Sequence, residues 1–298
     1  MTVDVDALVL PAFDDLAGLP GEAAPWRAAY DLGETIGIDG VSTPLRYSDR
    51  GLAVVPTGIG KAAAATTTTA LLSTDRLDLS GALVLSVGVA GGPPTLPVGS
   101  VVVADAIVDW DDKCRVDPTD GEGPIELNPY TGDRGVFDLD PDLAAAARSR
   151  AKGANIDLAA ADEGADDPRV VGGANLCGDE IWHGHDLAEQ ASRLVEIRGA
   201  GPYRATEMED AGTAAALQRF DRLDRYLSIR GGLGPGVALR SVLRGRLRGR
   251  DRKRRLGRPD GRRRPAGLTP RALAGLQPAS LVHSASTSRF ARTTVSPL

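Results

Sequence analysis

Apolar and polar positions along the first 230 residues form blocks that predict strands followed by helices. Short apolar runs ending in turn residues are typical of strands, and longer continuous runs such as "GALVLSVGVAGG" are typical of strands buried on both faces. Alanine-rich stretches with polar flanks predict helices. Strands are predicted at 6–13, 51–60, 81–92, 98–110, within 163–182 and at 224–229. Helices are predicted at 61–75, 140–151, 184–196 and 207–220.

This alternation predicts an α/β domain with a largely buried sheet. Residues 111–135 are rich in Asp, Gly and Pro and lack a period, which predicts a surface loop. No internal repeat divides the chain. We therefore expect one domain over 1–230, followed by a separate segment, 231–298, that is rich in Arg, Gly and Pro.

Charge separates the two segments sharply. Residues 231–298 hold 16 of the 35 Lys and Arg but only 2 of the 40 Asp and Glu, so the tail carries +14 and the front −19. An acidic domain repels nucleic acid and anionic membranes, so we expect neither as a partner. Such a surface also suits a protein that stays soluble at high salt, which favours a halophilic cytoplasm over an ordinary acidic surface.

Cysteine, histidine and hydropathy exclude several other classes of protein. Cys114 and Cys177 are too few for a disulfide framework or a metal cluster, so a reducing, cytoplasmic location is expected. No apolar run reaches about 18 residues, so no membrane span is predicted, and the N-terminus lacks the basic region of a signal peptide. His183 and His185 in "WHGH" have no further ligand nearby, and we predict a solvated turn there and no metal site.

Two glycine turns could hold a ligand. Gly58 and Gly60 stand between a predicted strand and helix, where backbone N–H groups can bind an anion. This turn lacks the third glycine of a dinucleotide fingerprint and the ending of a P-loop, so a purely structural turn is equally compatible. Gly88, Gly91 and Gly92 follow a second strand. Two such turns predict a shared ligand edge, although packing alone could also explain them.

A carboxylate cluster stands where a predicted strand becomes a helix. Glu207, Glu209 and Asp210 fall in "TEMEDAG", and the helix dipole alone would stabilise carboxylates in a first turn. A carboxylate fixed at such a junction can also accept two hydrogen bonds from a sugar diol. Met208 would then offer an apolar contact to the sugar ring.

These segments together resemble the nucleoside phosphorylase/nucleosidase superfamily. "TGIGKAAAATTTTALL", "LSVGVAGGPPTLPVGSVVVAD", "LCGDEIWHG" and "TEMEDAGTAAALQRF" followed by "YLSIR" occur in its order and at about its spacing, over residues 50–230. "LPAFDDLAGLPGEAAPW" is similar to the N-terminus of its purine nucleoside permease branch. The resemblance implies a mixed, partly barrel-like central sheet flanked by helices, here followed by a poorly ordered basic tail.

The resemblance also implies cleavage of the N-glycosidic bond of a purine nucleoside, without a cofactor, by a homo-oligomer. Glu209 would bind the ribose hydroxyls, with Met208 against the sugar, and Ile181 and Trp182 would contact the base. The residues implied for phosphate or attacking water are Gly58, Gly60, Ser86 and Gly88. An alternative is an accessory nucleoside-binding protein for uptake, without catalysis, which the name of the branch suggests.

Two departures from the pattern bear on activity. Phosphorylases of the superfamily carry an Arg before the second glycine turn, whereas this chain has Ser86, which carries no charge. Lys61 could replace it, so phosphate as co-substrate and water remain open alternatives. After a strand like "YLSIR" the superfamily continues with an Asn or Asp that addresses the purine, but here "GGLGPGVALRSV" follows. The catalytic general acid is therefore unknown, and reduced activity is expected.

The basic tail allows three interpretations. Thirteen basic residues fall in 240–264, which could bind nucleic-acid phosphates, but no aromatic is interleaved for base stacking. The segment could instead be disordered low-complexity sequence. The third interpretation, favoured by the abrupt reversal of charge inside the motif, is that the end of the gene is read in a shifted frame.

Overall fold

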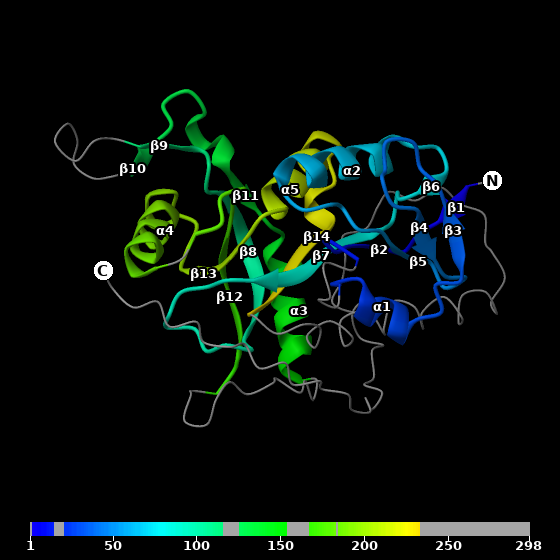
Figure 1. Cartoon of the computed structure of the whole chain (residues 1–298), viewed down its shortest axis with the longest axis horizontal. Helices are drawn as coiled ribbons and strands as arrows, with labels where there is room; N and C mark the ends of the chain where they lie inside the picture. Colours follow the sequence, from blue (N-terminus) through cyan, green and yellow to red (C-terminus); the bar gives the residue numbers. More distant parts are fainter. Residues whose placement is uncertain (1, 15–20, 116–124, 154–166, 183, 233–298) are drawn as a thin grey trace, which may run out of the picture.

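The computed structural model describes residues 2–14, 21–115, 125–153, 167–182 and 184–232. In these ranges the chain forms a central mixed sheet with helices on both faces, so the predicted fold class is confirmed (Figure 1). The basic tail beyond residue 232 lies outside the described residues. Its three interpretations, and the domain boundary at 230, stay predictions.

The central sheet is ten-stranded within the described ranges and has both parallel and antiparallel neighbours. Its path runs β13–β12–β8–β14–β7–β2–β5–β4–β3, and β11 pairs with β8 from outside this path. The strand bounds are β13 Tyr203–Glu207, β12 Val170–Cys177, β8 Val101–Asp109, β14 Tyr226–Gly232, β7 Leu83–Ala90, β2 Ala7–Leu10, β5 Leu52–Val54, β4 Leu45–Tyr47, β3 Glu34–Ile36 and β11 Val136–Asp138.

Strand β14 lies at the centre of this sheet. It runs parallel to β7 and antiparallel to β8, and its register places Arg230 beside Gly88. The long apolar runs occupy these inner strands because both of their faces are covered. The last predicted strand therefore exists and extends to Gly232, where it pairs with Ala90.

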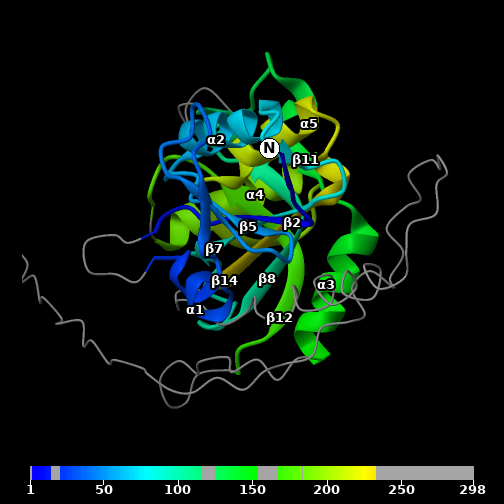
Figure 2. The same ribbon diagram turned by 90° about the vertical axis from the view of Figure 1, so that its right-hand side faces the viewer.

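Helices cover both faces of the sheet, as the two perpendicular views show (Figures 1 and 2). On one face lie α2 (Lys61–Ser73) and α5 (Asp210–Arg219), which pack against each other. The opposite face holds α1 (Ala24–Ala29) and α3 (Pro141–Gly153), and α4 (His185–Ile197) packs on β12 and β13. Each covered face has its own cluster of buried apolar side chains.

Helix α2 forms although it contains four consecutive threonines. Thr67 and Thr68 are buried, and Thr67 Oγ1 donates to the carbonyl of Thr57 at 2.9 Å. Thr66 Oγ1 donates to the carbonyls of Ala62 and Ala63 in the preceding turn. Tertiary packing and these bonds offset the weak helix propensity of β-branched residues.

The prediction that 111–135 is only a surface loop is wrong in part. Described residues there form the antiparallel pair β9 (Lys113–Arg115) and β10 (Ile125–Leu127), and a 3₁₀ turn, η1, spans Gly132–Gly135. Arg198 holds this segment through Asp112, with Nη2 and Oδ2 2.9 Å apart. The short parallel pair of β1 (Val3–Asp4) and β6 (Leu77–Asp78), and η2 (Leu223–Arg225), also had no apolar pattern to reveal them.

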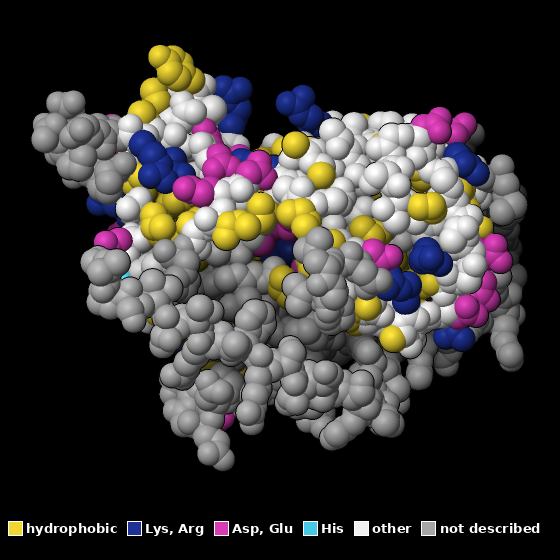
Figure 3. Space-filling model, viewed as in Figure 1, with side chains coloured by type: hydrophobic (Ala, Val, Ile, Leu, Met, Phe, Trp, Pro, Cys, Tyr) yellow, Lys and Arg dark blue, Asp and Glu magenta, His cyan; other side chains and the backbone are white. Residues whose placement is uncertain are grey.

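No helix among the described residues is both long and apolar enough to span a bilayer. On the face shown in Figure 3, acidic and basic side chains of the described residues are interspersed, without one continuous basic patch.

Candidate functional site

A buried guanidinium forms the centre of the candidate site. Arg230, near the end of β14, is 2% exposed and lies on the face of the sheet covered by α2 and α5. Its Nη2 donates to Ser86 Oγ at 2.6 Å and lies 2.9 Å from Glu207 Oε2, and it also pairs with Asp210. Burial alone would lower the pKa of Arg230, but Asp210 and Glu207 raise it well above its ordinary value. The group is therefore a permanent buried cation.

Asp210 holds this guanidinium in place. Its carboxylate accepts hydrogen bonds from Arg230, from Tyr226 at 2.8 Å, from Asn175 at 2.7 Å and from Ser228. Burial would raise the pKa of Asp210, yet Arg230 lowers it below the ordinary value. Tyr226, Ser228 and Arg230 point to the same carboxylate because alternate residues of β14 share one face of the sheet.

Glu22 brings a third carboxyl group to Arg230, from the segment before α1. Its Oε2 accepts the N–H of Ala12 at 2.6 Å and its Oε1 accepts the N–H of Val89 at 2.7 Å. A Cβ on Gly88 would overlap Glu22 Oε1 and lie 2.7 Å from Arg230 Nη1, so a side chain there would displace both groups. Burial raises the pKa of Glu22, against an opposing effect of Arg230.

Glu209 reaches the same site from the junction of β13 and α5. It is 6% exposed, its Oε1 accepts the N–H of Gly60 at 3.1 Å, and its Oε2 lies 3.9 Å from Arg230 Nη1. Burial raises the pKa of Glu209, and Arg230 opposes this. Met208, the residue before it, is half-buried. The structure thus brings Glu209, Gly60, Ser86 and Gly88 together around Arg230.

The first glycine turn does bind carboxylates, but they belong to the protein. Gly58 and Gly60 adopt φ of +87° and +95°, which glycine tolerates. The N–H of Gly58 donates to the carbonyl of Ala12, that of Gly60 to Glu209, and that of Lys61 to Asp179. The Nζ of Lys61 lies between Asp109 and Asp111, so the suggestion that this lysine replaces a phosphate-binding Arg is not supported.

The segment predicted to contact the base divides into two environments. Ile181 is 85% exposed, whereas the ring of Trp182 packs against Trp110 and Tyr203, with centroids 5.6 and 6.4 Å away. Base contact by either residue stays a prediction. A cavity of about 190 Å³ opens onto Arg230, which lines it together with Ala90, Gly91, Gly92 and Ala205 among others.

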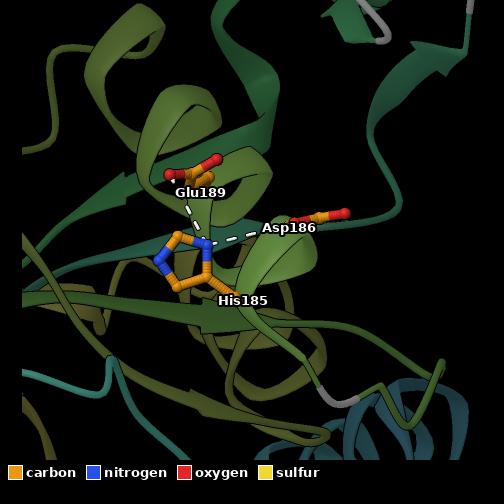
Figure 4. A group of neighbouring side chains, drawn as sticks. All are labelled: His185, Asp186 and Glu189. Carbon is orange, nitrogen blue, oxygen red and sulfur yellow. Dashed lines mark ion pairs between the residues drawn. The ribbon is translucent and has the colours of Figure 1, made fainter.

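The histidine-rich turn opens α4 at the surface. His185 Nδ1 lies 3.6 Å from Glu189 Oε1 and 3.9 Å from Asp186 Oδ1, and all three side chains are exposed (Figure 4). Their ligand atoms lie within 4.8 Å of one another, an arrangement that exposed acidic groups often show without a metal. His183 lies outside the described residues.

Arg230 and Glu22 were not among the site residues predicted from the sequence. Arg230 is the last residue of "YLSIR", and a lone Arg at the end of an apolar strand was the available signal. Only the pairing of β14 with β7 shows that it lies beside Ser86 and Gly88. Because this chain has Ser86 where phosphorylases carry an Arg, we predicted no positive charge there. Arg230 supplies one. Glu22 lies in the irregular segment before α1, where no periodicity marks it.

Glu207 gives the fold a testable pH dependence. Its Oε2 accepts the N–H groups of Glu209 and Asp210 at 2.7 and 3.0 Å, and burial raises its pKa from 4.5 to about 8 despite Arg230. Between these values the folded state keeps a proton that the unfolded state loses, so stability falls as pH rises. We expect the Glu207→Gln variant to lack this pH-dependent part of the free energy of unfolding.

Urea unfolding of wild type and Glu207→Gln from pH 5 to pH 9 measures the effect. The free energy of unfolding of the wild type, relative to the variant, should decline towards pH 8 and then level off. Parallel pH profiles for the two proteins would show that Glu207 does not titrate in this range.

The fold is a mixed α/β fold of the kind found in nucleosidases. Three solved structures show the same fold: 5′-methylthioadenosine/S-adenosylhomocysteine nucleosidase from Colwellia psychrerythraea, that from Neisseria meningitidis, and futalosine hydrolase from Helicobacter pylori. Their sequence identities are 23%, 22% and 22%, with TM-scores of 0.53, 0.52 and 0.52. The matches cover 78%, 76% and 77% of this chain and 82%, 84% and 84% of those chains.

The purine nucleoside permease (NUP) family matches residues 4–232. The chain therefore belongs to this family, and the predicted relationship is confirmed. No curated protein gives a significant match to the chain.

Proposed function

We propose that this protein hydrolyses the N-glycosidic bond of a purine nucleoside. The observation that carries the proposal is the position of Glu22. Its carboxylate already accepts the N–H of Ala12, just after β2, and the N–H of Val89, between Gly88 and Gly91, where a phosphate co-substrate would otherwise be held. Water is then the nucleophile that this turn favours.

The charges around the turn support the same choice. Within the described residues the carboxyl groups of Glu22, Glu207, Glu209 and Asp210 surround the single guanidinium of Arg230. Loss of a purine leaves a sugar with oxocarbenium character, which a carboxylate-rich pocket stabilises. A phosphate anion would meet repulsion from those of these groups that are ionised, Asp210 above all, whose pKa is, despite burial, lowered by Arg230.

The proposed roles fall to Glu209, Met208, Glu22 and the cavity beside them. Glu209, with Oε1 fixed by Gly60, accepts the ribose hydroxyls, and Met208 lies beside the sugar. Glu22, whose pKa is raised by burial, takes a proton from the attacking water. The cavity beside Gly91 and Gly92 receives the base, and the reaction needs no cofactor. We assign no described residue as the acid that protonates the leaving base.

A nucleoside-binding role in uptake is the second candidate, because the family description names a permease. Both roles would use the same ribose clamp, but only hydrolysis would use the Glu22 carboxylate beside it as a base. The two candidates differ in turnover and not in ligand class.

Incubation of the whole chain with inosine or adenosine tests the proposal. We expect free hypoxanthine or adenine to accumulate in phosphate-free buffer, detected by chromatography. Saturable binding without release of base would contradict hydrolysis and favour the binding role. Lack of binding would exclude both.

A further inference from the structure

Lys61, the first residue of α2, lies in a half-buried cluster of opposite charges next to the proposed site. Its side chain is 18% exposed, and its Nζ lies 2.6 Å from Asp109 Oδ1 and 2.7 Å from Asp111 Oδ2. Burial would lower the pKa of Lys61, but these two carboxylates raise it above its ordinary value. The ammonium is therefore fixed between the end of β8 and the residues that follow it.

Two hydrogen bonds, each from a backbone N–H to an aspartate carboxylate, connect the residues of this ion pair in a ring. The N–H of Lys61 donates to Asp179 Oδ1 at 2.8 Å, and the N–H of Asp179 donates to Asp111 Oδ2 at 3.0 Å. The ring joins three segments that are distant in sequence: the end of β8, the loop after β12 and the start of α2. Asp179 is hydrogen-bonded to both Lys61 and Asp111, which also pair with each other. These contacts fix the position of the first turn of α2.

That position determines where the N–H of Gly60 points. Gly60 is the residue before Lys61, has φ of +95°, and donates to Glu209 Oε1 at 3.1 Å. Helix α5 touches the same turn, because a Cβ on Gly212 would overlap the carbonyl of Lys61. A shift of Lys61 would therefore move the amide that orients Glu209.

We propose that Lys61 is a positioning residue for Glu209, and that it acts through the amide of Gly60 to fix the clamp for the ribose diol. This inference rests on the proposed role of Glu209. Lys61 itself does not bind the substrate, because two carboxylates already occupy its ammonium. Its loss should weaken recognition of the 2′- and 3′-hydroxyls and leave recognition of the base unchanged.

The test compares Lys61→Met with the wild type on two ligands, inosine and 2′,3′-dideoxyinosine. The control variant is Lys113→Met, which removes a nearby half-buried lysine whose Nζ lies 3.5 Å from the centroid of the Trp110 ring. Dissociation constants come from calorimetry, after circular dichroism has shown that each variant is folded. Asp111→Asn provides a milder variant, because Asp109 would still pair with Lys61.

We expect Lys61→Met to weaken inosine binding about tenfold, as a misplaced charge-assisted hydrogen bond would, and to change dideoxyinosine binding less than twofold. Asp111→Asn should give a smaller change of the same kind, and Lys113→Met none. The proposal would be overturned if Lys61→Met weakened the binding of inosine and dideoxyinosine equally, or left the binding of inosine unchanged.

The outcomes separate this inference from the proposed function. If the wild type binds inosine but releases no base, hydrolysis fails while the comparison of ligands still decides the role of Lys61. If the wild type binds neither nucleoside, the ribose clamp is wrong and the role of Lys61 falls with it.

Discussion

Replacing Glu22 by Gln should lower kcat for release of the purine base by about 10²–10⁴-fold, the usual contribution of a general base. A neutral amide cannot take a proton from water. It can also accept only one of the two N–H bonds from Ala12 and Val89 that Glu22 now accepts. Binding of inosine should stay within about twofold, because the ribose contacts belong to Glu209.

Initial rates under saturating inosine, with dissociation constants from calorimetry, measure both effects. Glu189→Gln is the matched control, since Glu189 is exposed on α4 and makes no contact with the site. A Glu22→Gln protein with wild-type kcat would exclude Glu22 as the base.

Replacing Glu209 by Ala should reduce kcat/KM for inosine by about 10²-fold or more, because misplaced reactants alone can cost that factor. The variant loses the carboxylate that the Gly60 amide and Arg230 orient toward the proposed sugar site. The kcat/KM for dideoxyinosine, which lacks both hydroxyls, should fall much less.

The corresponding control is Glu196→Ala, an exposed glutamate near the end of α4. The comparison uses steady-state kinetics with both nucleosides. A Glu209→Ala protein that binds inosine as tightly as the wild type would refute the ribose clamp.

The sequence revealed those parts of the site that lie in one local motif. Glu209 stands where an apolar strand becomes an alanine-rich helix, and Gly58 and Gly60 stand between a strand and a helix. Both junctions were visible as changes of pattern. Gly88 was visible for the same reason, as one of the glycines that interrupt a long apolar run.

The rest of the site depends on register and on irregular backbone. Arg230 faces Ser86 and Gly88 because β14 pairs with β7, which a pattern along one strand cannot show. Glu22 approaches through a segment without periodicity. The partners of Lys61 come from segments about 50 and 118 positions later, so only the folded chain shows that its charge is already neutralised.

The sugar product formed from inosine, with and without added phosphate, distinguishes hydrolysis from phosphorolysis. Occupation of the glycine turn by Glu22 predicts that free ribose and hypoxanthine form at the same rate in both buffers. Formation of ribose 1-phosphate, at a rate that rises with phosphate concentration, would show that phosphate and not water attacks the sugar.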